Sequence, residues 1–267
     1  MKYVWLLLFV VSIGNAQENV HFKKEITTDS IHLNLVNTMY GPFEVKIKVN
    51  DSLSNKVKVK EYSVLAARDT LQKAISFPLE IVNDTSSMRY TDYAAADLML
   101  GDPNAVHNDD YEYALPYSKG AKYKIVQGFN GSFTHNSVRS RYAIDFNLRV
   151  GDTINAAREG IVVRTKDDSK EHGGKEFINK ANLITILHDD GTMAAYVHLD
   201  YKGVLVKPGD TIKRGQPIGI SGLTGFTRGP HLHFVVREGK NVSIPIYFKG
   251  YNKKYLKKGK KYKNKNE

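Results

Sequence analysis

The stretch GPHLHFVV, Gly229 to Val236, places two histidines one residue apart in a run that otherwise has the composition of a buried strand. Side chains at positions i and i+2 of a strand lie on the same face. His231 and His233 are therefore expected to point the same way, while Leu232 between them faces the core. The stretch predicts a strand that carries polar chemistry on one face only.

Similar short segments, punctuated by glycine, precede it along the chain. They are YAIDFNL, GIVVRT, NLITILH, MAAYVHL and TIKRGQPIGISG. Segments of this length and spacing, without a long amphipathic helix nearby, favour an all-β domain built on antiparallel sheet. We assign this domain to residues 117–248.

The same alternation predicts the direction of other polar side chains. In YAIDF it places Asp145 on the face of Ala143, opposite Ile144 and Phe146. In AAYVHL it places His198 on the same face as Tyr196. Each polar side chain would then leave the apolar side of its strand intact.

The N-terminal half indicates a smaller β-rich domain, over residues 17–109. The segment EVKIKVNDSLSNKVKVK, from Glu44, alternates strictly and predicts a half-solvated hairpin. Its first arm would place Val45, Ile47 and Val49 on one face, and its second arm would return with Val57 and Val59. The turn-forming residues that follow Gly101 indicate a connector, with the linker itself at residues 110–116.

The first residues, MKYVWLLLFVVSIGNAQ, have the layout of a secretory signal peptide. One lysine precedes an apolar run that is too short to span a bilayer, and small residues follow it. We predict a signal peptide at residues 1–16 and an exported protein, either periplasmic or secreted.

The formal net charge of +11 is concentrated at the C-terminus, where residues 252–267 contain eight lysines and one glutamate. We define residues 249–267 as a Lys-rich tail. Such a segment is usually a solvated, disordered end. The alternative is that it holds an anionic envelope polymer or a membrane surface. No nucleic-acid partner is expected, because no RNA- or DNA-binding motif accompanies the charge.

The chain contains no cysteine and nine histidines. Disulfides, thiolate ligands and cysteine nucleophiles are thereby excluded, which leaves His, Asp and Glu as metal ligands. Five histidines are not expected in the site. His21 and His32 lack acidic or histidine neighbours, His107 lies in the acidic segment HNDD where a turn role is expected, and His172 and His188 are expected in a loop and at the mouth of a hairpin. The five are His21, His32, His107, His172 and His188.

The remaining histidines, with Asp145, could surround a divalent cation. A buried, unpaired imidazole is costly, whereas zinc accepts neutral His nitrogens and a carboxylate. Two His and one Asp leave a fourth position open for water, which is typical of a catalytic zinc site. Surplus histidines could then serve as base and transition-state stabiliser. The four histidines are His135, His198, His231 and His233.

At these residues the chain resembles the M23 family of zinc metallopeptidases, the lysostaphin-type or LytM-type endopeptidases of bacterial cell walls. The resemblance covers about residues 117–246 and rests on an ordered series of segments. They are the His135–Asp145 pair, AAREGIVV, YVHL, VKPGDTIKRGQPIGISG and TGFTRGPHLHF. It implies a LytM-type catalytic domain that cleaves peptides of peptidoglycan.

Residue by residue, the resemblance implies one zinc ion per chain, held by His135, Asp145 and His233. It makes His198 and His231 the catalytic pair, without deciding which is the general base. Two departures stand out. Nine residues separate His135 from Asp145 and must loop out, and Phe129 stands near the place where some lytic members carry a tyrosine.

Three other readings compete with this one. A cupin-type barrel would use Gly225, His231, His233 and Glu238, but the chain lacks the second histidine motif downstream, and Glu238 should face away from the two histidines. A serine hydrolase at Ser221 lacks the full nucleophile elbow. A catalytically silent wall-binding or regulatory module stays open as the main alternative.

Overall fold

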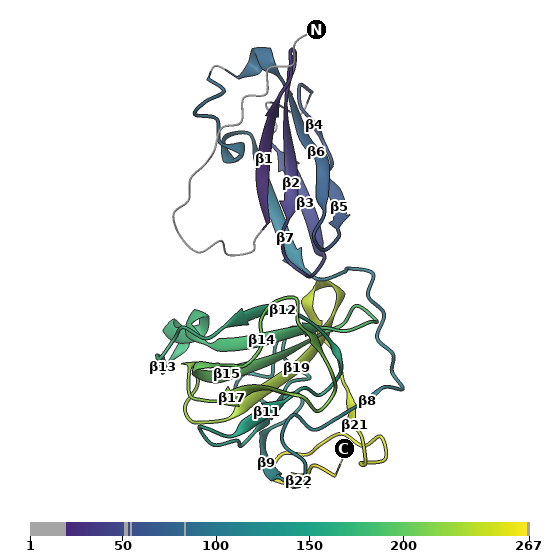
Figure 1. Cartoon of the computed structure of the whole chain (residues 1–267), viewed down its shortest axis with the longest axis vertical. Coiled ribbons are helices and arrows are strands. Elements are labelled where there is room, and N and C mark those ends of the chain that lie inside the picture. Colours follow the sequence, from purple (N-terminus) through teal and green to yellow (C-terminus); the bar gives the residue numbers. More distant parts are fainter. Residues whose placement is uncertain (1–19, 51–52, 54, 83, 266–267) are drawn as a thin grey trace.

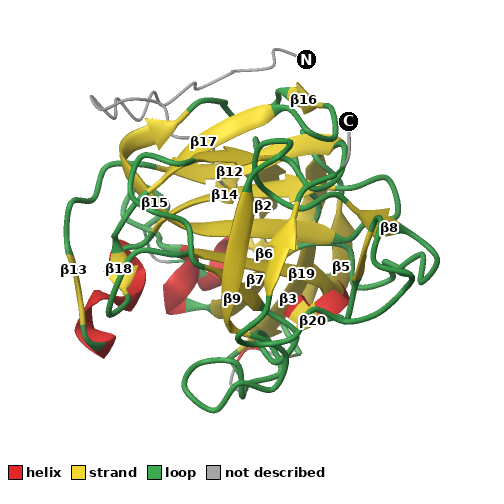
Figure 2. Ribbon diagram, turned by 90° about the horizontal axis from the view of Figure 1, so that it is seen from below, coloured by secondary structure: helices red, strands yellow, loops and turns green. Residues whose placement is uncertain are grey.

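The computed structural model describes residues 20–50, 53, 55–82 and 84–265. The signal peptide predicted at residues 1–16 lies outside this part of the chain. Figure 1 shows two β-rich bodies that follow one another along the long axis. Seen from below in Figure 2, strands dominate and the helical turns are short. Within the described ranges, no helix has the length and apolar character needed to cross a membrane.

The N-terminal body is a sandwich of two antiparallel sheets. One sheet has the order β1-β2-β6-β4, and the other has the order β5-β3-β7. Alternate side chains of both sheets, such as Leu35, Val45 and Phe77, are buried between them. The strands are β1 Val20–Ile26, β2 Ser30–Asn37, β3 Phe43–Val49, β4 Lys58–Val59, β5 Tyr62–Leu65, β6 Thr70–Pro78 and β7 Ala94–Leu100, with short helices η2 Leu79–Ile81 and η3 Tyr90–Asp92.

The hairpin predicted from Glu44 to Val59 is wrong. Its first arm is β3, whose partners are β5 and β7, while the residues of its second arm form β4, which pairs with β6 in the opposite sheet. Val45, Ile47, Val49 and Val57 are buried as the alternation required. Two faces of one sandwich core bury both arms equally well, so alternation could not distinguish a hairpin from a crossing between sheets.

The second body is built on a large sheet, and its all-β, antiparallel character is as predicted. The main path of the 11-stranded sheet runs β16-β12-β14-β15-β19-β10-β9-β22. The strands are β8 Glu112–Tyr113, β9 Lys122–Gln127, β10 Ile144–Phe146, β11 Thr153–Asn155, β12 Gly160–Lys166, β13 His172–Gly173, β14 Asn182–Leu187, β15 Met193–Val204, β16 Thr211–Ile212, β17 Pro217–Ser221, β18 Gly225–Phe226, β19 Leu232–Glu238, β20 Val242–Ser243, β21 Tyr247–Phe248 and β22 Lys261–Lys263, with helices η4 Lys175–Lys180 and η5 Gly239–Asn241.

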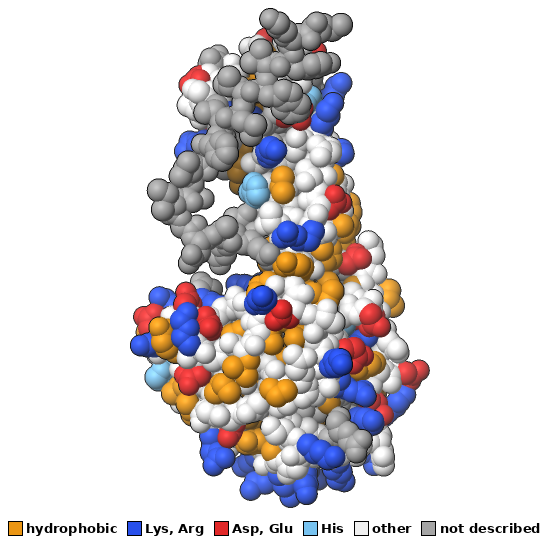
Figure 3. Space-filling model, viewed as in Figure 1, with side chains coloured by type: hydrophobic (Ala, Val, Ile, Leu, Met, Phe, Trp, Pro, Cys, Tyr) orange, Lys and Arg blue, Asp and Glu red, His pale blue; other side chains and the backbone are white. Residues whose placement is uncertain are grey.

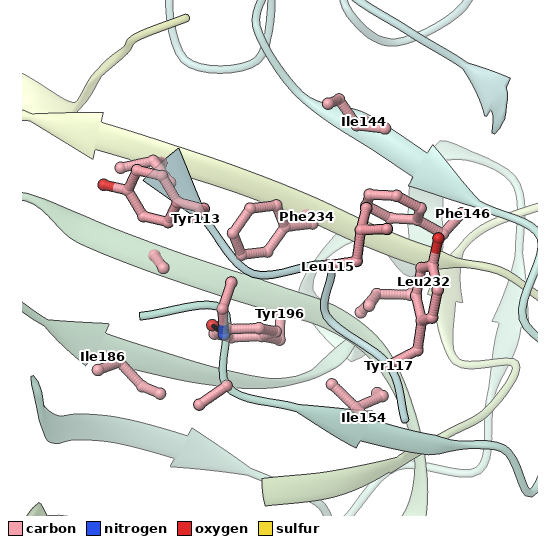
Figure 4. Close-up of a cluster of buried hydrophobic side chains, with 14 of the residues drawn as sticks. Tyr113, Leu115, Tyr117, Ile144, Phe146, Ile154, Ile186, Tyr196, Leu232 and Phe234 are labelled. Atoms are coloured by element: carbon pink, nitrogen blue, oxygen red, sulfur yellow. Dashed lines mark hydrogen bonds between the residues drawn. The ribbon is translucent and has the colours of Figure 1, made fainter. Parts of the chain in front are cut away.

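One face of this sheet covers the core. Leu232 and Phe234 of β19 point into it beside Phe146 of β10 and Tyr196 of β15, as Figure 4 shows. The Tyr196 and Phe234 rings lie with centroids 5.0 Å apart. Burial of such large side chains anchors the three central strands and fixes which residues face the other side.

The segment from Glu112 to Tyr117 packs into this same core. Tyr113, Leu115 and Tyr117 are all at most 1% exposed, and β8 pairs in parallel with β21 near the C-terminal end of the domain. The buried structure of the second body therefore begins inside the stretch that we assigned to a linker.

The prediction of a disordered tail is wrong for its described residues. Strand β22 pairs antiparallel with β9 at the end of the large sheet. Leu256 and Asn264 are buried, and the Tyr117 hydroxyl donates a 2.8 Å hydrogen bond to the Tyr262 carbonyl. Composition indicated disorder because lysine is the commonest residue of the tail, but Tyr251, Leu256 and Tyr262 among the lysines pack into the core.

Candidate metal centre and active site

Strands β10 and β19 bring an aspartate and a histidine face to face. Asp145 and His233 are directly paired in the register of these strands, on the side of the sheet away from the core. Their ligand atoms, Asp145 Oδ1 and His233 Nδ1, are 2.9 Å apart. The alternation predicted from YAIDF and HLHF therefore holds: Ile144, Phe146 and Leu232 are buried in the core.

His135 comes from the segment before β10. Residues 132–142 form a series of turns, so the nine residues between His135 and Asp145 loop out as expected. Backbone hydrogen bonds close this loop, from Asn130 N to the Arg141 carbonyl at 2.7 Å and from Ala143 N to the Ser140 carbonyl at 2.8 Å. The His135 side chain is fully buried.

Three side-chain atoms converge on one point. His135 Nε2 lies 3.2 Å from Asp145 Oδ1 and 3.3 Å from His233 Nδ1, which closes a triangle with the 2.9 Å contact above. A zinc ion with Zn–N bonds of about 2.0–2.1 Å and tetrahedral angles spaces its ligand atoms about 3.3–3.4 Å apart. The triangle is close to that size, so the chemistry and the geometry of the donor set both fit a tetrahedral metal ion.

Neighbouring groups set the orientation of two of these side chains. His135 Nδ1 donates a hydrogen bond of 2.9 Å to the Gly128 carbonyl, which leaves the lone pair on Nε2 directed at the triangle. Gln127 Nε2 donates a 2.9 Å hydrogen bond to the other oxygen of Asp145, Oδ2. Only one carboxylate oxygen of Asp145 then faces the two histidines.

A β-bulge places Gln127 at this position. Asp145 pairs with Gln127, but the next residue, Phe146, pairs with Ile125, so Val126 is an extra residue in β9. Ile125 can thereby face the core while Gln127 faces the candidate metal centre, a common use of bulges beside active sites. The sequence analysis did not predict Gln127, because only the register shift between β9 and β10 brings it to Asp145.

A second bulge positions His198. Leu199 pairs with Asn182 and Val197 pairs with Leu183, so His198 is the extra residue, and its backbone φ is 70°. A positive φ is strained for a residue with a Cβ atom. The prediction that Tyr196 shares a face with His198 is wrong: Tyr196 faces the core, and the bulge turns His198 to the opposite side.

His198 and His231 lie beside the triangle. Their ring centroids are 4.7 Å apart, and the His198 and His233 rings are 6.1 Å apart. His231 Nε2 is 3.7 Å from Asp145 Oδ1. The structure therefore brings all five residues predicted for the site into one cluster.

Both of these histidines are oriented by backbone carbonyls. His198 Nδ1 donates to the Thr224 carbonyl at 2.6 Å, and His231 Nδ1 donates to the Gly229 carbonyl at 2.9 Å. In a neutral imidazole with Nδ1 protonated, Nε2 carries the lone pair. Each histidine can then accept a proton at Nε2.

Burial and neighbouring side chains shift the pKa values of three groups in the cluster, His198, His233 and Asp145. Burial, reinforced by His231 and His233, lowers the pKa of His198 to about 3, and burial also lowers the pKa of His233. Burial acts to raise the pKa of Asp145, but the neighbouring side chains of His135 and His233 outweigh it and hold that pKa well below its usual value. Neutral imidazoles and an ionised carboxylate are the states in which these side chains bind metals.

The residues that we discounted lie elsewhere. His188 is at the mouth of the β14–β15 hairpin, as expected, where its backbone N–H bonds the Thr192 carbonyl. His172 pairs with Gly225 in a short two-stranded sheet. Phe129 packs against the rings of Tyr142 and Tyr255, at 5.3 and 5.1 Å, rather than in the site.

Residues 139–245 match the model of Peptidase family M23. The chain therefore carries an M23 peptidase domain. The matched range of the M23 domain includes Asp145, His198, His231 and His233, and His135 precedes it by four residues.

Curated relatives of the M23 domain include proteins named as peptidoglycan endopeptidases. Peptidoglycan DD-endopeptidase ShyA of Vibrio cholerae is 32% identical over 121 residues, which is 44% of this chain and 26% of that protein. Lysostaphin of Staphylococcus staphylolyticus is 33% identical over 132 residues, 49% of this chain and 24% of that protein. An uncharacterized metalloprotease of Buchnera aphidicola is 34% identical over 135 residues, 49% of this chain and 32% of that protein. The chain thus spans a third or less of each relative's length.

Among solved structures, lysostaphin from Staphylococcus simulans aligns with 46% of this chain and 47% of that chain. The two share 30% sequence identity in this alignment, and the TM-score is 0.36.

Proposed function

We propose that this protein is a zinc-dependent metalloendopeptidase that hydrolyses peptide bonds in the cross-links or stem peptides of bacterial peptidoglycan. The observation that carries the proposal is the triangle of His135 Nε2, Asp145 Oδ1 and His233 Nδ1, with two further histidines beside it. The substrate class comes from the relatives of the M23 domain whose names describe action on peptidoglycan.

In this proposal His135, Asp145 and His233 hold one zinc ion. Zinc in such a site supplies Lewis-acid polarisation of the scissile carbonyl and makes water nucleophilic at neutral pH. Gln127 and the Gly128 carbonyl keep two of the three ligands in place, which is the usual role of outer-shell partners.

His198 and His231 handle the protons. Both are held by carbonyl acceptors at Nδ1, so each presents Nε2 to the reacting groups. One accepts the proton that the attacking water loses, and the other stabilises the oxyanion or protonates the leaving amine. His231 is the more open of the two side chains, at 16% exposure.

We propose that the protein acts outside the cytoplasm, in the periplasm or the extracellular space. Residues 1–16 have the composition of a signal peptide, and a peptidoglycan substrate lies in the same compartment.

The test uses residues 17–267 and isolated peptidoglycan, with released fragments identified by mass spectrometry. We expect one zinc per chain and new peptide termini. His233→Ala should lose both zinc and activity, whereas His231→Ala should keep zinc and lose about 10²–10⁴-fold in rate. His172→Ala, an exposed histidine of the same domain, is the matched control and should behave as the parent protein.

Zinc-loaded protein that leaves peptidoglycan uncut would favour the alternative, a silent wall-binding or regulatory module. Cleavage that survives His231→Ala and His198→Ala together would instead contradict the assignment of the catalytic pair.

A further inference from the structure

The folded tail arranges lysines in two facing rows. In the pairing of β9 with β22, Lys124 is opposite Lys261 and Lys122 is opposite Lys263. Between these pairs, Tyr123 is opposite Tyr262, and both tyrosines are partly buried against the core. The four lysines are exposed and share the outward face. We call these four residues the lysine ribbon.

The lysine ribbon works against the stability of the strand pair that carries it. Like charges directly opposite each other in an antiparallel pair are destabilising. Among the described residues, none of the four ribbon lysines has an ion pair to an acid, whereas Lys253, further back in the tail, pairs with Asp110. The repulsion is therefore not relieved by carboxylates within the ribbon, and a bound polyanion would relieve it.

The surrounding residues extend the same charge. Lys257, Lys258 and Lys260 are exposed in the turn that leads into β22. Figure 3 shows Lys and Arg side chains gathered at this end of the molecule, where Figure 1 places β9 and β22. The patch is therefore elongated and carries one sign of charge.

We propose that the lysine ribbon binds a linear, phosphate-bearing polymer. Its charges recur about every 7 Å along each strand and about 5 Å across the pair, so a flexible chain of phosphates can contact several lysines in succession. Lysine acts as a flexible point charge, which suits a chain that binds in many registers. The site is independent of the proposed hydrolysis.

Two other polyanionic partners fit less well. Segments that lie in a membrane interface present Trp, Phe or Leu for insertion beside their basic residues, and the ribbon face carries none. Single-stranded nucleic acids bind through exposed aromatic platforms, whereas Tyr123 and Tyr262 turn inward.

The position of the ribbon relates it to the candidate active site. Strand β9 begins at Lys122 and ends at Gln127, which contacts Asp145. At about 3.4 Å per residue, Lys122 lies roughly 17 Å along the strand from this contact and Lys124 roughly 10 Å. A polymer bound at the ribbon would hold the M23 domain close to the structure that carries the polymer. It would not enter the candidate metal centre.

The experiment measures binding of residues 17–267 to labelled long-chain inorganic polyphosphate by fluorescence anisotropy at several salt concentrations. The variant K122Q/K124Q/K261Q/K263Q should bind about tenfold or more weakly, and the slope of log K against log salt should fall by about three. The matched control K48Q/K56Q/K58Q/K60Q removes four exposed lysines of the N-terminal sandwich and should bind like the parent.

Folding is monitored on the same samples. The glutamine variant should melt at the same temperature as the parent or higher, because the cross-strand repulsion is gone. The variant K122R/K124R/K261R/K263R keeps the charges and should keep the affinity. Equal loss in the ribbon and control variants, or loss in the arginine variant, would overturn the proposal. Binding to phosphatidylglycerol vesicles without binding to polyphosphate would also overturn it, in favour of a membrane. The binding assay does not measure hydrolysis. A failure of the polymer proposal would therefore leave the proposed function untouched.

Discussion

Gln127 lies directly opposite Asp145, and its amide holds the one carboxylate oxygen of Asp145 that does not face His135 and His233. The side-chain oxygen of Gln127, Oε1, in turn accepts a hydrogen bond of 3.2 Å from Phe133 N. The amide is thus held at both ends, between the loop that carries His135 and the strand that carries Asp145. This arrangement makes Gln127 a positioning residue for the candidate metal centre.

Gln127→Met should weaken zinc binding by about 10–100-fold, because methionine fills the same space without holding Asp145 Oδ2. The affinity is measured by competition with a chromophoric chelator. Gln216→Met changes a partly buried glutamine far along the chain and should leave the affinity unchanged. An unchanged affinity in Gln127→Met would show that the bulge alone orients Asp145.

His198→Gly should be more stable than His198→Ala, with a free energy of unfolding about 1 kcal/mol higher. A backbone φ of 70° strains any residue that has a Cβ atom, and glycine has none. Chemical denaturation of the two metal-free variants measures the difference. Val197 lies next to it in the strand without such a φ, so Val197→Gly should be less stable than Val197→Ala. The same order at both positions would contradict a strained bulge at His198.

His188 should make stability depend on pH. Its side chain is buried beside Tyr113, its Nε2 has no hydrogen-bond partner among the described residues, and burial lowers its pKa to about 4. Between about pH 6.5 and pH 4 the unfolded chain binds a proton that the folded protein does not, so the unfolding free energy falls as the pH falls.

His188→Gln removes this titration and keeps a hydrogen-bond donor for the Glu159 carbonyl. From pH 7 to pH 5 the parent should lose up to about 2 kcal/mol more than this variant. Urea unfolding at the two pH values gives the comparison, with exposed His172→Gln as the control. Parallel losses in parent and variant would mean that His188 is not the titrating group.

Asn264→Ala should destabilise the M23 domain by about 1–3 kcal/mol. The Asn264 amide donates to the carbonyls of Leu115 and Tyr117, and its loss leaves buried acceptors without a partner. Differential scanning calorimetry of the variant and the parent measures the loss of stability. Asn179→Ala, at an exposed position, is expected to change little. If both variants melted like the parent, the hydrogen bonds of Asn264 would contribute nothing to stability.

The residues of the candidate site were implied by the resemblance to the M23 family, and their directions on β10 and β19 were predictable because strand alternation acts locally. His231, Leu232 and His233 point where a period of two requires. His198 was assigned to the site from the segment YVHL. The direction predicted for its side chain from alternation was wrong, since the bulge reverses it. Gln127 was invisible for the same reason, because a single extra residue in β9 brings it to Asp145.

The set of five residues in the candidate site was implied by the resemblance to the M23 family. The sequence pattern by itself determined the all-β class and the alternation of side chains around Asp145 and His233. Those features depend on neighbours one or two positions apart. The tertiary structure alone decided the partner of each strand, the two bulges and the folding of the tail. Register and pairing are set by packing between segments far apart in the chain, and the lysine ribbon exists only because β22 returns to β9 across more than a hundred residues.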